Sequence, residues 1–161
     1  MLCLLDANVL IRAHEDYYGL EQVPQFWEWL LEKASAGSVK MPFEIHDEIA
    51  TANGPLPAWI RQEPVKTALI LQEEVQPDLL DQVMNQYGSP PFIDSDLEKI
   101  GRDPMLVAYA LVSTDRVVVT KEVSAPSKIG ANRKIPDVCN SLGVTVMKDF
   151  DFFRALGFKA R

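Results

Sequence analysis

The order of apolar and polar positions along the chain predicts short buried strands separated by helices. Residues 2–5 are consecutive apolar residues that precede Asp6, a pattern typical of a strand buried on both faces of a parallel sheet. Residues 39–41, 117–119 and 144–146 predict three further strands. Because strands that alternate with helices form parallel sheets covered on both faces, we expect the α/β class. The predicted architecture is a three-layer α/β/α sandwich with a mostly parallel central sheet.

Apolar side chains at helical spacing predict the helices between these strands. One helix begins at Pro24 and ends before Gly37, with Trp29 just outside its apolar stripe. Its aromatic residues are expected to be core residues rather than a platform for stacking bases. Further helical patterns lie within residues 9–13, 43–52, 59–87, 94–100, 103–111 and 149–156, and another helix is predicted to begin at Pro136.

Length and composition indicate one soluble globular domain that spans residues 1–161. Hydrophobic residues make up 47% and charged residues 24% of the chain, which excludes a disordered protein. No apolar run is long enough to span a bilayer, and the first run lacks the basic start of a signal peptide. Cys3 and Cys139 form neither a disulfide framework nor a zinc motif. We therefore expect a cytoplasmic protein without a membrane partner.

The net charge of −7 disfavours non-specific binding of nucleic acid over the whole surface. A local basic segment is nevertheless present at residues 121–134. It contains one carboxylate, that of Glu122, and four cations: Lys121, Lys128, Arg133 and Lys134. These four residues are the predicted contacts to substrate phosphates. The alternative is that their charges are simply solvated in a loop.

Several acidic residues lie at the ends of predicted elements. Asp6 follows the first strand, Asp103 begins a helix, and Glu122 follows the valine-rich strand, whereas Glu48 lies at the margin of an apolar helix face. Ligands of open α/β sheets bind at the carboxyl ends of the strands, so these side chains could converge. Two carboxylates about 4 Å apart repel by about 4 kcal/mol at an effective dielectric constant of 20. Such a cluster must hold protons or bind a hard cation such as Mg²⁺ or Mn²⁺.

Each of these acids also has a structural interpretation. Asp6 and Asp103 are placed where helix N-caps occur. Glu48 could be a solvated helix acid and Glu122 a loop acid. Asp137 lies in a predicted first helical turn, where an acid favours the helix dipole. We interpret Asp137 first as a structural residue and second as an accessory ligand.

The order of these blocks along the chain resembles the PIN-domain nuclease superfamily. Residues 4–11 (Leu-Leu-Asp-Ala-Asn-Val-Leu-Ile) look like its opening motif. The later blocks match in sequence at residues 47–49, 103–110 and 118–122. Residues 26–30 and 135–139 are similar to a poorly characterised bacterial branch of that superfamily. The resemblance covers residues 2 to about 147.

The resemblance implies a metal-dependent ribonuclease that uses Mg²⁺ or Mn²⁺ to cleave RNA phosphodiesters. Asp6, Glu48 and Asp103 would be catalytic metal ligands, and Glu122 would be the fourth. Glu122 departs from the pattern, which usually has Asp there, and its extra methylene group would reposition a metal or weaken its binding. The implied supporting residues are Asn8 and Thr120, which would orient ligands or water.

The resemblance also implies partners. Many prokaryotic relatives are toxins that an antitoxin protein holds inactive, and many form homodimers. The substrate would be single-stranded RNA, because splayed bases can reach a recessed site. His14 and His46 are the two histidines, and neither belongs to a His-x-x-x-His pair or a Ser-His-Asp arrangement.

Two other functions remain open at this stage. A haloacid-dehalogenase-type phosphatase also begins with a strand and an Asp, but Asn8 stands where its second Asp is expected, and Asp149 and Asp151 imitate its late acidic pair only loosely. A catalytically lapsed module that binds a partner is the other alternative, because Glu122 replaces the usual Asp.

Overall fold

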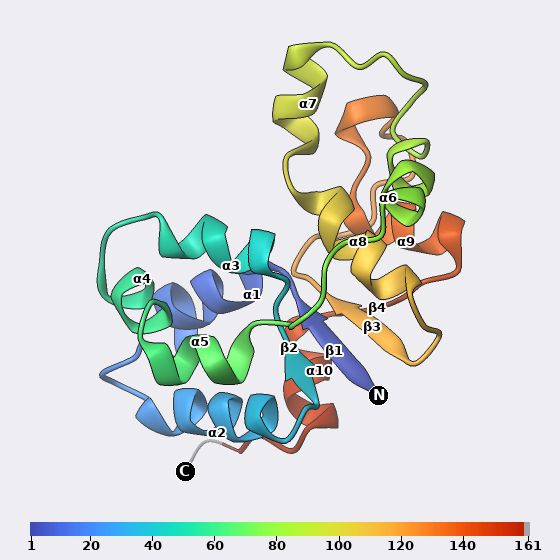
Figure 1. Cartoon of the computed structure of the whole chain (residues 1–161). Helices are drawn as coiled ribbons and strands as arrows, with labels where there is room; N and C mark the ends of the chain where they lie inside the picture. The colour runs from blue at the N-terminus through green and yellow to red at the C-terminus, as the bar shows by residue number, and fades with distance from the viewer. Residues whose placement is uncertain (160–161) are drawn as a thin grey trace.

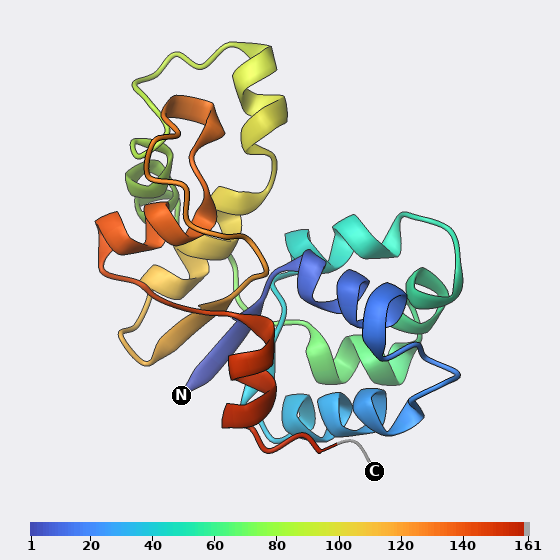
Figure 2. The ribbon, with the colours of Figure 1, turned by 180° about the vertical axis from the view of Figure 1, so that it is seen from behind.

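The computed structural model describes residues 1–159 and contains a four-stranded sheet at its centre (Figure 1). The strands lie in the order β2-β1-β3-β4, and every neighbouring pair is parallel. Their bounds are β1 (Leu2–Leu5), β2 (Val39–Lys40), β3 (Arg116–Val119) and β4 (Thr145–Met147). Helices lie on both sides of the sheet (Figures 1 and 2). The predicted α/β class and three-layer α/β/α architecture are therefore confirmed.

Each helical layer covers one face of the sheet (Figures 1 and 2). One layer contains α6 (Pro77–Met84), α7 (Asp94–Ile100), α8 (Asp103–Leu111) and α9 (Ile135–Leu142). The other contains α1 (Ala7–Arg12), α2 (Pro24–Ser35), α3 (Phe43–Ala50), α4 (Pro55–Ile60), α5 (Glu63–Leu69) and α10 (Asp149–Ala155). A π-helical turn, η1 (Ala13–Tyr17), continues α1, and a 3₁₀ turn, η2 (Gly130–Asn132), precedes α9. Many of the α-helices carry a proline in the first turn, where its missing N–H costs no hydrogen bond.

The two central strands, β1 and β3, pair from Leu2–Arg116 to Leu5–Val119. From β1 the chain passes to β2 on one side, and from β3 it passes to β4 on the other. The carboxyl ends of β1 and β3 therefore flank the point where strand order reverses, which is where open α/β sheets bind ligands. Asp6 and Thr120 are the first residues after these two strands.

The aromatic residues of α2 belong to the core, as predicted. Phe26 and Trp27 are buried, and Trp29 is buried as well, although the helical pattern predicted that it would lie outside the apolar stripe. The reason is that α10 covers a second side of α2: the rings of Trp29 and Phe152 are 5.7 Å apart. A contact with an element more than a hundred residues away leaves no trace in the local pattern.

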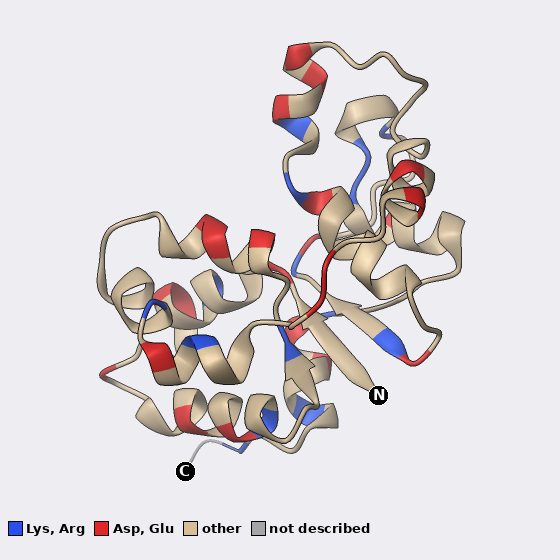
Figure 3. Cartoon of the chain, viewed as in Figure 1, with Lys and Arg blue, Asp and Glu red and all other residues tan. Residues whose placement is uncertain are grey.

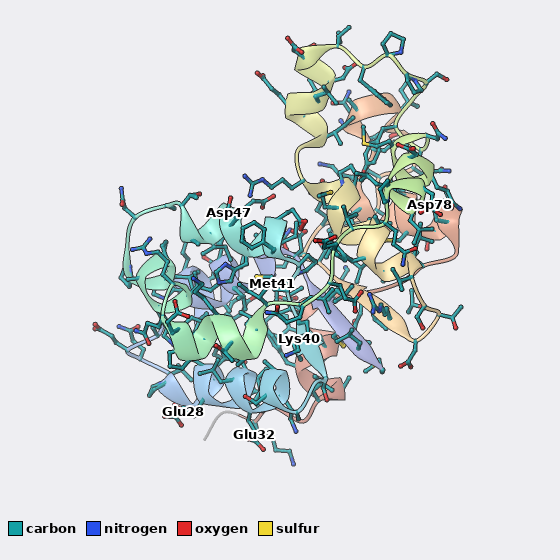
Figure 4. The ribbon with its side chains drawn as sticks, in the orientation of Figure 1. Glu28, Glu32, Lys40, Met41, Asp47 and Asp78 are labelled. Carbon is teal, nitrogen blue, oxygen red and sulfur yellow. The ribbon has the colours of Figure 1, made fainter. Side chains whose placement is uncertain are left out.

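The predicted helical stretch 59–87 is broken in the structure. It contains the end of α4, then α5 and α6, and residues 70–71 between them run beside the end of β2. Met41, labelled in Figure 4, donates its N–H to the carbonyl of Leu69 and accepts the N–H of Leu71, at 2.8 and 2.9 Å.

Within residues 1–159, no helix has both the length and the apolar character needed to cross a membrane.

Candidate active site

Asp6 is held rigidly at the end of β1. One carboxylate oxygen, Oδ1, accepts the N–H of Ala7 at 2.8 Å, so Asp6 caps α1 as the capping interpretation predicted. The other, Oδ2, accepts the hydroxyl of Thr120 at 2.8 Å. The residue is 6% exposed. Burial, and secondarily the negative charge of Glu122, raise the pKa of Asp6 to about 6, while these hydrogen bonds limit the rise.

Thr120 and Asn8, the two predicted supporting residues, form a hydrogen-bond network at this edge. The Thr120 hydroxyl, which donates to Asp6, accepts the N–H of Glu122 at 3.1 Å and the side-chain amide of Asn8 at 3.4 Å. Asn8 Oδ1 accepts the N–H of Lys121 at 3.0 Å. These bonds join the segment after β1 to the segment after β3, which fixes the acids of the two segments relative to each other.

Asp103 enters the same region from α8. It is the first residue of that helix and makes no capping hydrogen bond, so the interpretation of Asp103 as an N-cap is wrong; Arg102 occupies that position. Burial is the main cause that raises the pKa of the Asp103 carboxyl to about 8, and the charges of Asp6, Glu122 and Glu48 add to it. These four acidic residues, Asp6, Glu48, Asp103 and Glu122, are called the acidic cluster below.

Glu48 joins the cluster from α3. The residue is exposed overall, but enclosure of its carboxyl group is the main cause that raises its pKa, followed by the charge of Asp6, and Arg102 opposes both. Arg102 also fixes α3 to the start of α8, because it donates to the backbone carbonyl of Glu44 at 2.7 Å and to Asp47 Oδ2 at 2.9 Å. Asp47 is labelled on α3 in Figure 4.

Glu122 contributes a carboxylate that already has a structural bond. Its Oε2 accepts the N–H of Ile135 at 2.7 Å, at the start of α9. Glu122 also lines a cavity with Asp103.

The donor atoms of the acidic cluster have the chemistry that a divalent cation requires, although its ligand set is not assembled. Within the part of the chain that the structure describes, no group of three or more Asp, Glu, His or Cys side chains is placed so that it could hold a metal ion. The donor set consists of carboxylate oxygens, which Mg²⁺ and Mn²⁺ prefer. The negative charges of the cluster also repel one another, and a bound cation would relieve that repulsion. Glu48 also lines a cavity of about 260 Å³ together with residues of α1, η1 and α4.

Asp137 and Lys121 were predicted to be site residues, but their side chains bond to groups outside the acidic cluster. Asp137 accepts the hydroxyl of Ser124 and, at 2.9 Å, the N–H of Ala125, and these bonds lower its pKa. Lys121 forms an ion pair with Asp149 at 3.0 Å. The hydroxyl of Tyr17 donates to the same carboxylate. Asp137 therefore has the structural role that was its first interpretation, and the ammonium group of Lys121 is engaged on α10.

The other predicted cations surround a basic cavity of about 230 Å³ beside Asp103 and Glu122. Its basic lining residues are Lys99, Lys128, Arg133 and Lys134. In Figure 3, Lys and Arg colour the end of α7 and the segment that leads into α9, on either side of the start of α8. The guanidinium of Arg133 is occupied by hydrogen bonds to Gln86, Asp137 and Ser141. The three lysines are the cations that face this cavity without such anchoring bonds among residues 1–159.

Sequence reasoning missed Lys99 and Tyr87. Lys99 follows three acids on α7, and no local pattern shows that α7 packs near η2. Tyr87 is buried, and among the described residues its hydroxyl has no hydrogen-bond partner. Burial, together with the charges of Asp103 and Glu122, raises the pKa of Tyr87. A tyrosine in an apolar stripe gives no signal of such neighbours.

His46 and His14 have structural roles. Nε2 of His46 lies 2.9 Å from the carbonyl oxygen of Ile60 and joins α3 to α4, and burial lowers the pKa of this imidazole. His14 Nδ1 accepts the N–H of Leu20 at 3.2 Å. Among the described residues, neither histidine is therefore hydrogen-bonded to the acidic cluster.

Comparison with known proteins adds a family but no activity. A search of curated proteins finds no match. A protein-family model matches residues 3–160, which is nearly the whole chain. The chain therefore belongs to the family described as "Domain of unknown function (DUF4411)".

Proposed function

We propose that this protein is a ribonuclease that uses Mg²⁺ or Mn²⁺ to hydrolyse phosphodiester bonds of single-stranded RNA. The observation that carries the proposal is the convergence of four carboxylates from distant segments at the point where strand order reverses. Burial raises the pKa of Asp103 to about 8, and repulsion from the other three carboxylates adds to that rise. A fold that needed these residues only for stability would gain nothing from such repulsion.

In this proposal Asp6, Glu48, Asp103 and Glu122 hold one or two divalent ions. When bound, such an ion activates water and neutralises the charge that develops on the phosphate. Thr120 holds one oxygen of Asp6 and the Ala7 N–H holds the other, so this carboxylate is oriented before any ligand arrives.

The basic cavity binds the RNA backbone next to the cluster. Lys99, Lys128 and Lys134 line it together with Asp103 and Glu122. Phosphate groups are attracted to these lysines, and the rest of an acidic surface repels them. Arg133 supports the cavity by anchoring its loop, and Lys121 supports it by anchoring the end of β3.

The resemblance to PIN-domain nucleases supports the same proposal and extends it to partners. The proposed protein partner is an antitoxin that blocks the acidic cluster, and the proposed assembly is a homodimer. Growth arrest on expression, relieved by a small neighbouring gene product, would identify the antitoxin. Light scattering of the purified protein would give the assembly state.

The direct test is cleavage of a labelled single-stranded RNA by the purified protein with Mg²⁺ or Mn²⁺. We expect cleavage that EDTA abolishes and that Asp6→Asn and Asp103→Asn each reduce by about 100-fold or more, because each removes charge that the reaction needs. Asp78→Asn is the matched control: Asp78 is exposed on α6, and its carboxylate lies outside the cluster (Figure 4). Equal cleavage by all variants would identify a contaminant and refute the proposal.

One observation favours a second function, that of a non-catalytic binding module. The carboxylate of Glu122 is already bonded to the N–H of Ile135, so Glu122 has a structural reason to be present. Calorimetric titration with Mn²⁺ separates the two functions. Binding that Asp103→Asn abolishes supports the nuclease, whereas heats that are equal for wild type and variant support the binding module.

A further inference from the structure

A second cavity shares the lining residue Glu122 with the basic cavity. Its volume is about 620 Å³, within the range of about 300–1,000 Å³ that is usual for small-molecule sites. Glu122 lines both cavities, and Thr120 lines the larger one. The larger cavity therefore begins at the acidic cluster itself.

The walls of the larger cavity are mainly apolar. They are formed by Val123, Pro136, Val146 and Met147. Val123 is 62% exposed, which is unusual for a valine next to a buried sheet edge and leaves its methyl groups available to a ligand. Asn140 and Lys148 add polar groups at the margin, and an amide can both donate and accept hydrogen bonds.

Charge distinguishes the two cavities. The basic cavity presents lysines, whereas the larger cavity has one cation, Lys148, against the carboxylates of Glu122 and Asp151 among its described lining residues. A phosphate group is therefore favoured in the first cavity and disfavoured in the second. A flat, uncharged ring with polar edges fits the second cavity, and a nucleobase is such a group.

We infer that the larger cavity receives one unstacked base of the RNA strand whose backbone occupies the basic cavity. The inference rests on the proposed ribonuclease function and adds the reason for its substrate class. A base can enter only when it is neither paired nor stacked, so single strands bind and duplexes do not. Because Glu122 lines both cavities, a strand that occupies both passes beside this member of the acidic cluster.

The test measures binding by fluorescence anisotropy in EDTA at low salt. The probes are a labelled ten-uridine RNA, the same oligomer with one abasic position moved along the strand, and a duplex RNA of equal length. We expect one abasic position to weaken binding about fivefold or more, because that oligomer lacks the base that fills the cavity. The duplex should bind more weakly than the intact single strand.

Variants then assign the effect to this cavity. Val123→Ala with Asn140→Ala removes two exposed wall residues, and we expect it to reduce the difference between intact and abasic oligomers to less than about twofold. Ser35→Ala with Thr67→Ala is the matched control, because both residues line a cavity of about 530 Å³ beside α5. This control should keep the wild-type difference.

The outcomes separate this inference from the proposed function. If the protein cleaves RNA but binds intact and abasic oligomers equally, the inference is wrong and the ribonuclease stands. If binding depends on one base but no metal supports cleavage, the inference stands and catalysis is refuted. If no RNA binds, the inference is wrong, and the cleavage assay with Mg²⁺ or Mn²⁺ decides the ribonuclease separately. Equal binding of duplex and single strand also overturns the inference.

Discussion

Asp103 shows how a single residue can report on the acidic cluster. Its ordinary pKa of 3.8 is raised to about 8 in the folded chain, first by burial and then by the neighbouring carboxylates. Between these two pH values the folded protein binds a proton that the unfolded chain releases. The stability contributed by protonated Asp103 is therefore complete below pH 4 and is lost as the pH rises toward 8.

We predict that Asp103→Asn stabilises the metal-free protein more at pH 8 than at pH 5, by at least about 1 kcal/mol, since one pKa unit corresponds to about 1.4 kcal/mol. Asparagine resembles the neutral acid and carries no charge at either pH. Urea unfolding in EDTA measures the difference. Asp78→Asn should show no such pH dependence, and a pH-independent effect of Asp103→Asn would contradict the prediction.

At the scale of elements, Lys121 and Asp149 connect the end of β3 to the start of α10. Asp149 is 3% exposed, and Lys121 and Tyr17 both contact its carboxylate. The ammonium group also lies 5.4 Å and 5.6 Å from the ring centres of Tyr17 and Phe150. A buried carboxylate that loses its cation is costly, so this pair is expected to stabilise the attachment of α10.

We predict that Lys121→Met lowers the free energy of unfolding by about 3 kcal/mol. Adding Asp149→Asn to that variant should restore most of the loss, because no unpaired charge then remains. Arg154→Met breaks the exposed pair with Asp151 and should change stability by less than about 1 kcal/mol. RNA affinity that falls with Lys121→Met at constant stability would instead assign Lys121 to the substrate.

Elements were predictable where the signal is local. The run 117–119 indicated β3, prolines marked helix starts, and Asp6 followed directly from the end of β1. The convergence of Asp6, Asp103 and Glu122 also followed, because parallel strands share one carboxyl edge. Contacts between distant segments could not be predicted: neither the pairing of Lys121 with Asp149 nor the approach of Lys99 leaves a periodic pattern.

At the scale of the whole molecule, charge separation allows an acidic protein to approach RNA. The chain carries a net charge of −7, yet α7 and the segment before α9 place three lysines around one cavity. Figure 3 shows acidic residues spread over both helical layers. Binding should therefore depend on salt through a few local contacts rather than through the whole surface.

We predict that Lys99→Gln and Lys134→Gln each reduce the slope of log K against log salt concentration by about 0.7, the value for one phosphate contact on a single strand. Lys66→Gln, on α5 and paired with Glu63, is the control and should leave the slope unchanged. Anisotropy titrations between low and moderate salt give the slope. An unchanged slope for Lys99→Gln would remove α7 from the RNA-binding surface.

The outer strands of the sheet are very short: β2 has two residues and β4 has three. A strand from another molecule could form only a few hydrogen bonds there, and residues 70–71 already run beside the end of β2. Short outer strands are one way in which proteins avoid joining edge to edge. Two copies of this chain would therefore associate through helices, and aggregation through a shared, extended sheet is disfavoured.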